Sequence, residues 1–156
     1  MKSPYDDQYS TCKETSVVFR LIHPAIDLDS ITAALKLAPS RAWRKGDPAE
    51  WKGRPARTGM WMLDSEGMVV SRDLRRHLDW LILQLRGKHD QLREFRDAGY
   101  HIDVFCHWVQ LGGTGGPTLS PANMRGLAEL DLELGFEFWS ETDDDDVRNT
   151  DVSTSS

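Results

Sequence analysis

The sequence predicts an α+β protein, folded as a two-layer sandwich in which a mostly antiparallel sheet carries helices on one face. Two observations support this prediction. Apolar side chains recur every three or four positions over residues 71–99, which is the spacing of one face of a helix. Residues 101–110 alternate instead between an apolar and a more polar side, as a strand with one buried face does. The order of the predicted elements makes a ferredoxin-like topology the expected arrangement of the first six.

Before the long helical segment, the chain predicts three strands and one helix. Residues 15–23 (TSVVFRLIH) are rich in β-branched and aromatic side chains and end at Pro24, so they predict a strand. Asp27 is a suitable N-cap for the helix that follows. Residues 41–47 predict a short strand and residues 58–65 another, with a loop rich in Gly, Pro and charge between them.

The long helical segment is the element against which the others are expected to pack. Ser71 is the predicted N-cap, and Asp73 in the first turn suits the positive end of the helix dipole. Gly99 predicts the end of the segment, and Gly87 leaves open whether it forms one helix or two. The apolar stripe consists of Leu74, Leu78, Leu81, Ile82, Leu85, Leu92 and Phe95.

Three elements complete the prediction. The inner residues of the strand at 101–110 are Ile102, Val104, Cys106 and Trp108. Ser120 and Pro121 then predict the start of a helix. Its expected inner residues are Met124, Leu127 and Ala128. A last strand over residues 132–140 alternates again, and its inner residues are Leu132, Leu134, Phe136 and Phe138.

The chain has 156 residues, a length typical of one domain with a single core. Its net charge of −6 is concentrated at the ends. Residues 141–156 hold six carboxylates against one arginine, and residues 1–14 carry −1, which leaves residues 15–140 neutral. Because both ends are polar, we expect a disordered leader over 1–14, a single domain over 15–140 and an acidic disordered tail over 141–156.

Several classes of protein are disfavoured. No apolar run approaches the roughly 20 residues of a membrane span, and the N-terminal residues lack the apolar centre of a signal peptide, so a cytoplasmic protein is expected. Cys12 lies in a polar stretch and Cys106 in an apolar strand, which argues against a disulfide. The sequence has no GxSxG, HExxH or CxxC motif. It therefore favours a protein without catalytic activity and assigns no catalytic residue and no cofactor.

Short motifs are spread over residues 15–140. They are Leu37-Ala38-Pro39-Ser40 with Lys45-Gly46-Asp47, the segment Trp61-Met62-Leu63-Asp64-Ser65, Leu74 with His77-Leu78 and Leu81, the Gly112-Gly113 loop, and the helix-to-strand passage at 127–134. Together they resemble the bacterial family known as domain of unknown function 4279. The resemblance implies a small cytoplasmic α+β domain, and it transfers no catalytic residue.

The first candidate site is the loop over residues 41–61, where six cations outnumber two carboxylates and tryptophans are interleaved. Cations bind phosphate groups and aromatic rings stack on bases, while Trp and Arg also dominate protein interfaces. Three interpretations stay open: a solvated hairpin, a protein interface, and a site for a phosphate-bearing ligand or nucleic acid. The candidate residues are Arg41, Trp43, Arg44, Lys45, Trp51, Arg54 and Arg57.

Two other candidates are weaker. His101, Asp103 and His107 share a strand face and include metal-ligand types, but about 20 Å of strand separates the two histidines. Another segment, such as the one with His23, would have to complete a site, so we favour solvent-exposed polar residues and assign no metal. The glycine loop at 112–116 precedes a helix but lacks the Lys-Ser/Thr ending of a P-loop, and it predicts a flexible connection.

We therefore expect a non-enzymatic cytoplasmic binding module, of a regulatory or immunity type, whose partner is another protein. The alternative is a domain that binds a phosphate-bearing ligand or nucleic acid through the loop at 41–61. The overall acidity of the chain argues against strong nucleic-acid binding, and no membrane partner is expected.

Overall fold

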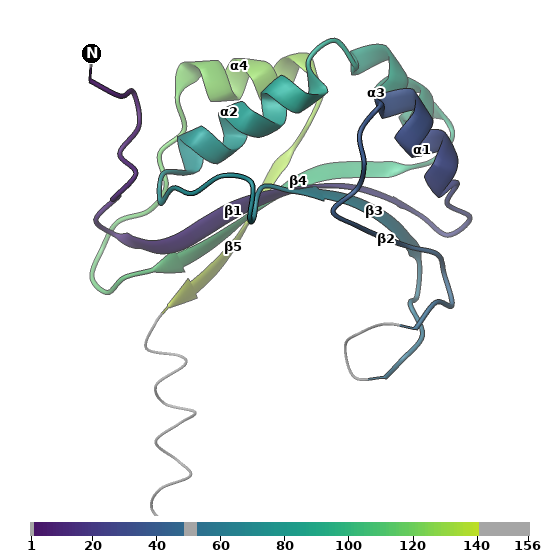
Figure 1. Ribbon diagram of the computed structural model, residues 1–156, viewed down its shortest axis with the longest axis horizontal. Helices are drawn as coiled ribbons and strands as arrows, with labels where there is room; N and C mark the ends of the chain where they lie inside the picture. Colours follow the sequence, from purple (N-terminus) through teal and green to yellow (C-terminus); the bar gives the residue numbers. More distant parts are fainter. Residues whose placement is uncertain (1, 49–52, 141–156) are drawn as a thin grey trace, which may run out of the picture.

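The computed structural model describes residues 2–48 and 53–140. Five strands form one sheet, and four helices cover one of its faces (Figure 1). The strands are β1 Cys12–His23, β2 Arg41–Trp43, β3 Gly59–Asp64, β4 His101–Gln110 and β5 Leu134–Ser140. The helices are α1 Leu28–Leu35, α2 Leu74–Leu85, α3 His89–Asp97 and α4 Pro121–Glu129. The predicted α+β class and the placement of the helices on one face are confirmed.

The strands lie in the order β2-β3-β1-β4-β5. Neighbours pair antiparallel except β4 and β5, which run parallel, so the sheet is mixed but mostly antiparallel. The helix α4 makes the crossover that a parallel connection requires. The ferredoxin-like topology expected for the first six elements stays a prediction. The sheet curves away from the helices at both ends, which makes its uncovered face concave (Figure 1).

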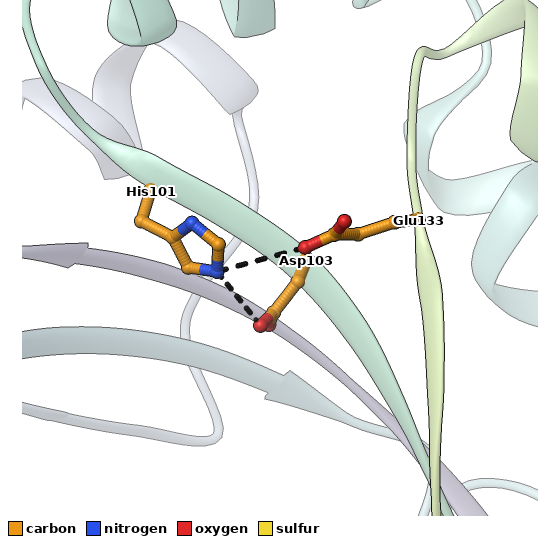
Figure 2. Close-up of side chains that lie close together, drawn as sticks. All are labelled: His101, Asp103 and Glu133. Carbon is orange, nitrogen blue, oxygen red and sulfur yellow. Dashed lines mark hydrogen bonds and ion pairs between the residues drawn. The ribbon is translucent and has the colours of Figure 1, made fainter.

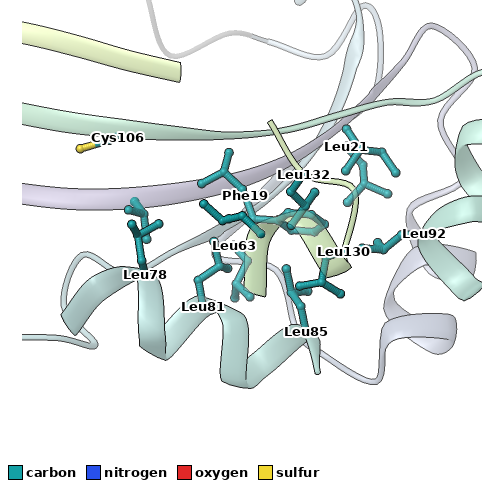
Figure 3. Close-up of a cluster of buried hydrophobic side chains, with 14 of the residues drawn as sticks. Phe19, Leu21, Leu63, Leu78, Leu81, Leu85, Leu92, Cys106, Leu130 and Leu132 are labelled. Atoms are coloured by element: carbon teal, nitrogen blue, oxygen red, sulfur yellow. The ribbon is translucent and has the colours of Figure 1, made fainter. Parts of the chain in front are cut away.

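The core lies between the sheet and the helices (Figure 3). Every second residue of β1, from Val17 through Phe19 to Leu21, is fully buried and points toward the helix layer. The α2 stripe meets these residues with Leu78, Leu81 and other leucines, all of them buried. The inner residues predicted for β4 are also buried. The alternation in the strands and the spacing in the helices therefore build one continuous core.

The segment predicted as one long helix or two is divided at Gly87. This residue has a φ of +77°, a left-handed conformation that glycine adopts without the strain of a Cβ, and it separates α2 from α3. The N-cap of α2 is Asp73, not the predicted Ser71. The Asp73 carboxylate accepts a hydrogen bond from the backbone N–H of Arg75. The Ser71 hydroxyl accepts one from the N–H of Asp73, which precedes the helix.

The prediction of a disordered leader over residues 1–14 is wrong for the described part of this segment. Its last residues belong to β1, and the preceding ones pack against α2. The Tyr5 hydroxyl donates to Asp79 at 2.6 Å, which raises the pKa of Tyr5 to about 12. The Arg76 guanidinium bonds to Asp7 and lies 4.3 Å from the centre of the Tyr5 ring. The tail predicted over 141–156 lies outside the described residues.

The inner side predicted for α4 is also partly wrong. Met124 and Ala128 are exposed, and only Leu127 of the three predicted residues is buried. The inward position belongs instead to Asn123, which accepts from the Ser120 N–H in a capping box and donates to the carboxylate of Asp79. A polar side chain can take this buried place because each of its groups has a partner.

The last strand begins at Leu134 and forms an edge of the sheet. Phe136 and Phe138 pair with Cys106 and Trp108 of β4, so they point to the helix side as predicted. They are nevertheless exposed, because the edge position leaves them outside the buried core. Within the described parts of the chain, no helix combines the length and apolar character needed to cross a bilayer.

Candidate functional site

The concave face of the sheet, opposite the helices, is the open face of this protein. It is built by the alternate residues of each strand, in rows that the pairing register sets. Val18 of β1 stands between Asp64 of β3 and Phe105 of β4. Because these side chains point away from the helices, the open face carries both polar and apolar groups at its centre.

This face is hollowed by a pocket of about 260 Å³, hereafter the open-face pocket. Its floor is apolar and consists of Val18, Met62 and Phe105. Its walls are mostly polar and consist of Glu14, Thr15, Ser16, Arg41, Asp64, Glu66 and His107. Three carboxylates therefore face one guanidinium around an apolar floor.

The position of the Phe105 ring depends on its neighbour in β5, Gly135. A Cβ at Gly135 would lie only 2.9 Å from Cε2 of Phe105, so the ring occupies the space that a larger residue would need. Arg20 lies over the same ring, with its Cζ 4.6 Å from the ring centre. The ring is therefore held between a glycine and a guanidinium at one side of the pocket.

The next row of the open face holds a charged cluster around Asp103 (Figure 2). Arg20 donates to both carboxylate oxygens of Asp103, from Nε at 2.8 Å and from Nη2 at 2.6 Å. His101 Nε2 lies 3.0 Å from Asp103 Oδ2 and 3.8 Å from Glu133 Oε1. The cluster thus joins β1, β4 and the residue that precedes β5.

Asp103 is almost entirely buried, with 4% of its surface exposed. This burial opposes its ionisation, but the hydrogen bonds and charge of Arg20, helped by His101, outweigh it and hold the pKa of Asp103 below its ordinary value. Asp103 is consequently a fixed negative charge at neutral pH. His101 and Glu133 are exposed beside it.

The described residues of the predicted basic loop occupy β2 and an extension of the β2–β3 hairpin. Two backbone hydrogen bonds of 2.8 Å between Gly46, Asp47 and Ala56 continue the hairpin beyond the sheet. Arg41, Arg44, Lys45, Arg54 and Arg57 are exposed and Trp43 is half-buried, whereas Trp51 lies outside the described residues. Among the members of this set that the structure describes, only Arg41 lines the open-face pocket.

The two histidines of β4 lie beside different carboxylates, as their separation along the strand predicted. His101 belongs to the Asp103 cluster, and His107 lies near Glu14, with 3.5 Å between His107 Nε2 and Glu14 Oε1. His23, suggested as a third contributor, stacks on a tyrosine instead. Sequence reasoning missed Glu133, because its place beside Asp103 depends on the parallel pairing of β5 with β4.

Three buried side chains, Ser65, Cys12 and Cys106, have nucleophile chemistry but no access to solvent. Ser65 Oγ donates to His77 Nδ1 at 2.7 Å, and His77 Nε2 donates to the carbonyl of Ser71. Both partners of this pair are buried, and burial lowers the pKa of His77, so the imidazole is a neutral part of the core. Burial likewise raises the pKa of the Cys106 thiol to about 11 and that of Cys12 to about 12, which keeps both protonated.

These features define a small α+β domain with one sheet face covered by helices and one concave face left uncovered. The family model described as Domain of unknown function (DUF4279) matches residues 11–141, and the chain belongs to this family. No curated protein matches the chain. No solved structure matches it either.

Proposed function

We propose that this protein is a non-enzymatic binding module, of the regulatory or immunity type and at work in a bacterial cytoplasm, that binds another protein through its open sheet face. The observation that carries the proposal is the open-face pocket. The side chains that contribute most to protein binding, above all Trp, Tyr and Arg, fill pockets near the centre of an interface. The Ser65–His77 pair and the two cysteines lie in the core, so these groups are not available for nucleophilic catalysis, which supports binding.

The chemistry of the open-face pocket favours a cationic side chain of the partner. An arginine or lysine has an apolar stem and a charged end, and it can lay the stem on an apolar floor while the end meets carboxylates. Met62 and Phe105 supply such a floor. Asp64 and Glu66 stand at one wall, where a single hydrogen bond, from the Glu66 N–H to Asp64 Oδ1, joins them. Charge complementarity then selects the partner and speeds its association.

The test uses two small probes of nearly the same shape, the cationic N-acetylarginine amide and the neutral N-acetylcitrulline amide. With the methionine methyl groups labelled for NMR, we expect the arginine amide to shift the Met62 signal and the citrulline amide to leave it unmoved. Met124, exposed on α4, is the internal control and keeps its position. The variant Asp64→Asn/Glu66→Gln is expected to weaken the response several-fold, and Glu94→Gln on α3 to leave it unchanged. Equal responses to the two amides would rule out recognition of the cation.

A second function is favoured by the exposed cations of the hairpin extension. Arg44, Lys45, Arg54 and Arg57 form no ion pair with another described residue. Such cations are available to phosphate groups, and the alternative is therefore a module for a phosphate-bearing ligand or nucleic acid. Its test is binding of single-stranded RNA or heparin at low and moderate salt. Binding that falls steeply with salt and is lost in Arg54→Glu/Arg57→Glu supports the alternative, and binding insensitive to both changes excludes it.

A further inference from the structure

We propose that His101, Asp103 and Glu133 form a binding site for a divalent transition-metal ion of the zinc type. Each residue offers one ligand atom, and the three atoms lie within 4.8 Å of one another (Figure 2). Two of the residues come from β4 and the third from the chain entering β5. This inference goes beyond the proposed binding of a protein, which uses the neighbouring open-face pocket.

The distances suit an ion of this size. Zinc binds imidazole nitrogen and carboxylate oxygen at about 2.0–2.2 Å in tetrahedral geometry, which sets neighbouring ligand atoms about 3.3–3.5 Å apart. The observed separations, 3.0 Å from His101 Nε2 to Asp103 Oδ2 and 3.8 Å to Glu133 Oε1, lie on either side of this value. Since His101 and Glu133 are exposed, small rotations of their side chains bring all three atoms to bonding distance. The fourth position is left to water or to a partner's side chain.

Arg20 orients the one buried ligand. Metal-binding carboxylates are commonly held by further hydrogen bonds, and the two bonds from Arg20 fix the plane of the Asp103 carboxylate. They leave Asp103 Oδ2 with the lone pair that His101 Nε2 now faces. A metal ion takes that position, and His101 then binds it through Nε2 with its proton on Nδ1. The positive charge of Arg20 opposes the ion, so we expect micromolar affinity, weaker than that of a structural zinc site.

Other histidines of the described chain offer less complete sets. His107 lies 3.5 Å from Glu14, but no group of three ligand atoms among the described residues includes it. His89 faces Asp131 with Nε2 and Asp90 with Nδ1, and the two ring nitrogens point in different directions, so these carboxylates cannot share one ion with it. Among residues 2–48 and 53–140, the cluster around Asp103 is the one group of three such ligands.

The experiment titrates the full chain, without an affinity tag and pretreated with a chelator, with Zn²⁺ by calorimetry and with Co²⁺ by visible absorption. We expect one ion per chain and the absorption bands of tetrahedral Co²⁺. His101→Ala and Glu133→Gln should each weaken binding by about tenfold or more, because each removes one of three ligands. The matched control His107→Ala, on the same face of the same strand, should bind as the unchanged protein does.

Several results would overturn the proposal. They are the absence of binding below about 100 μM, equal binding in His101→Ala, or loss of binding in His107→Ala. Unfolding curves show whether the variants are folded, and the exposure of His101 and Glu133 predicts that they are. The Met62 response to the arginine amide should persist in His101→Ala, so failure of the metal site and failure of the proposed protein-binding function are distinguished.

Discussion

The ring of Phe105 covers Gly135, the residue paired with it in the parallel neighbouring strand. A Cβ at position 135 would lie 2.9 Å from the ring, closer than carbon atoms can pack. The same ring supports Arg20 and lines the open-face pocket. The absence of a side chain at Gly135 therefore lets the Phe105 ring contact the edge strand, Arg20 and the pocket at once.

Replacing Gly135 by alanine should force the Phe105 ring to move, at a cost of about 1–3 kcal/mol in the free energy of unfolding. Urea denaturation measures this change. Gly116→Ala is the matched control, because a Cβ there would meet no atom within 4 Å and the backbone does not have a positive φ. A loss of stability as large in the control as in Gly135→Ala would show that the contact with Phe105 is not the cause.

Leu81, at the centre of the apolar stripe of α2, should be one of the residues most costly to truncate. It is fully buried, so Leu81→Ala removes apolar contact and leaves a cavity, with an expected loss of about 2–5 kcal/mol. Leu83 lies on the same helix with 58% of its surface exposed, and Leu83→Ala should change stability by less than about 0.5 kcal/mol. Comparable losses in thermal or chemical unfolding would show that the stripe does not face the core.

The parts of the fold that were predictable from sequence depend on local patterns. The strand at 101–110 has the predicted bounds, because its alternation is complete within ten residues. Asp27 and Ser120 are the caps that were predicted, since a cap interacts with backbone two or three positions away. The predicted inner side of α4 was wrong because Asn123 is buried there: its amide nitrogen donates to two residues of α2 and its amide oxygen accepts from Ser120, and a hydrophobicity pattern does not register such bonds.

The candidate site was less predictable, because it depends on contacts between distant segments. His101 and Asp103 were predicted to share a strand face, but Arg20 and Glu133 join them through the pairing of β4 with two other strands. The open-face pocket likewise takes its lining from β1, β2, β3 and β4. The residue types indicated metal-ligand side chains in β4, whereas the sheet register brings Arg20 and Glu133 to them.

Buried His77 should make the protein lose stability in mild acid. Burial lowers its pKa below the ordinary 6.5, so between the two values the unfolded chain binds a proton that the folded chain does not. The contribution of neutral His77 to the free energy of unfolding is therefore complete above about pH 6.5. It declines as the pH falls toward the folded pKa, by up to about 1.4 kcal/mol for each pH unit.

Unfolding of His77→Gln between pH 7.5 and 5 checks this expectation. The variant cannot titrate at this position, so its stability should change less with pH over this range, although it is lower at pH 7.5 because the bonds to Ser65 and Ser71 are altered. If the free energy of unfolding of His77→Gln changes with pH as steeply as that of the unchanged protein, other groups cause the acid sensitivity.

Asp103 should contribute stability at neutral pH that disappears in stronger acid. Burial disfavours its charge, yet Arg20 and His101 hold its pKa below the ordinary value of 3.8. A carboxylate with a lowered folded pKa stabilises the protein fully above its ordinary pKa, and this stability is lost as the pH falls through the folded value. Asp103→Asn, which accepts fewer hydrogen bonds from Arg20, should cost about 1.5–3 kcal/mol at pH 7. The difference from the unchanged protein should shrink below about pH 3.8.

Unfolding is measured with chelator present, so that no bound metal contributes, and Asp97→Asn on the exposed side of α3 serves as the control. A destabilisation by Asp103→Asn that is the same at pH 3 and pH 7 would mean that the carboxylate's charge is not what holds Arg20 on the open face.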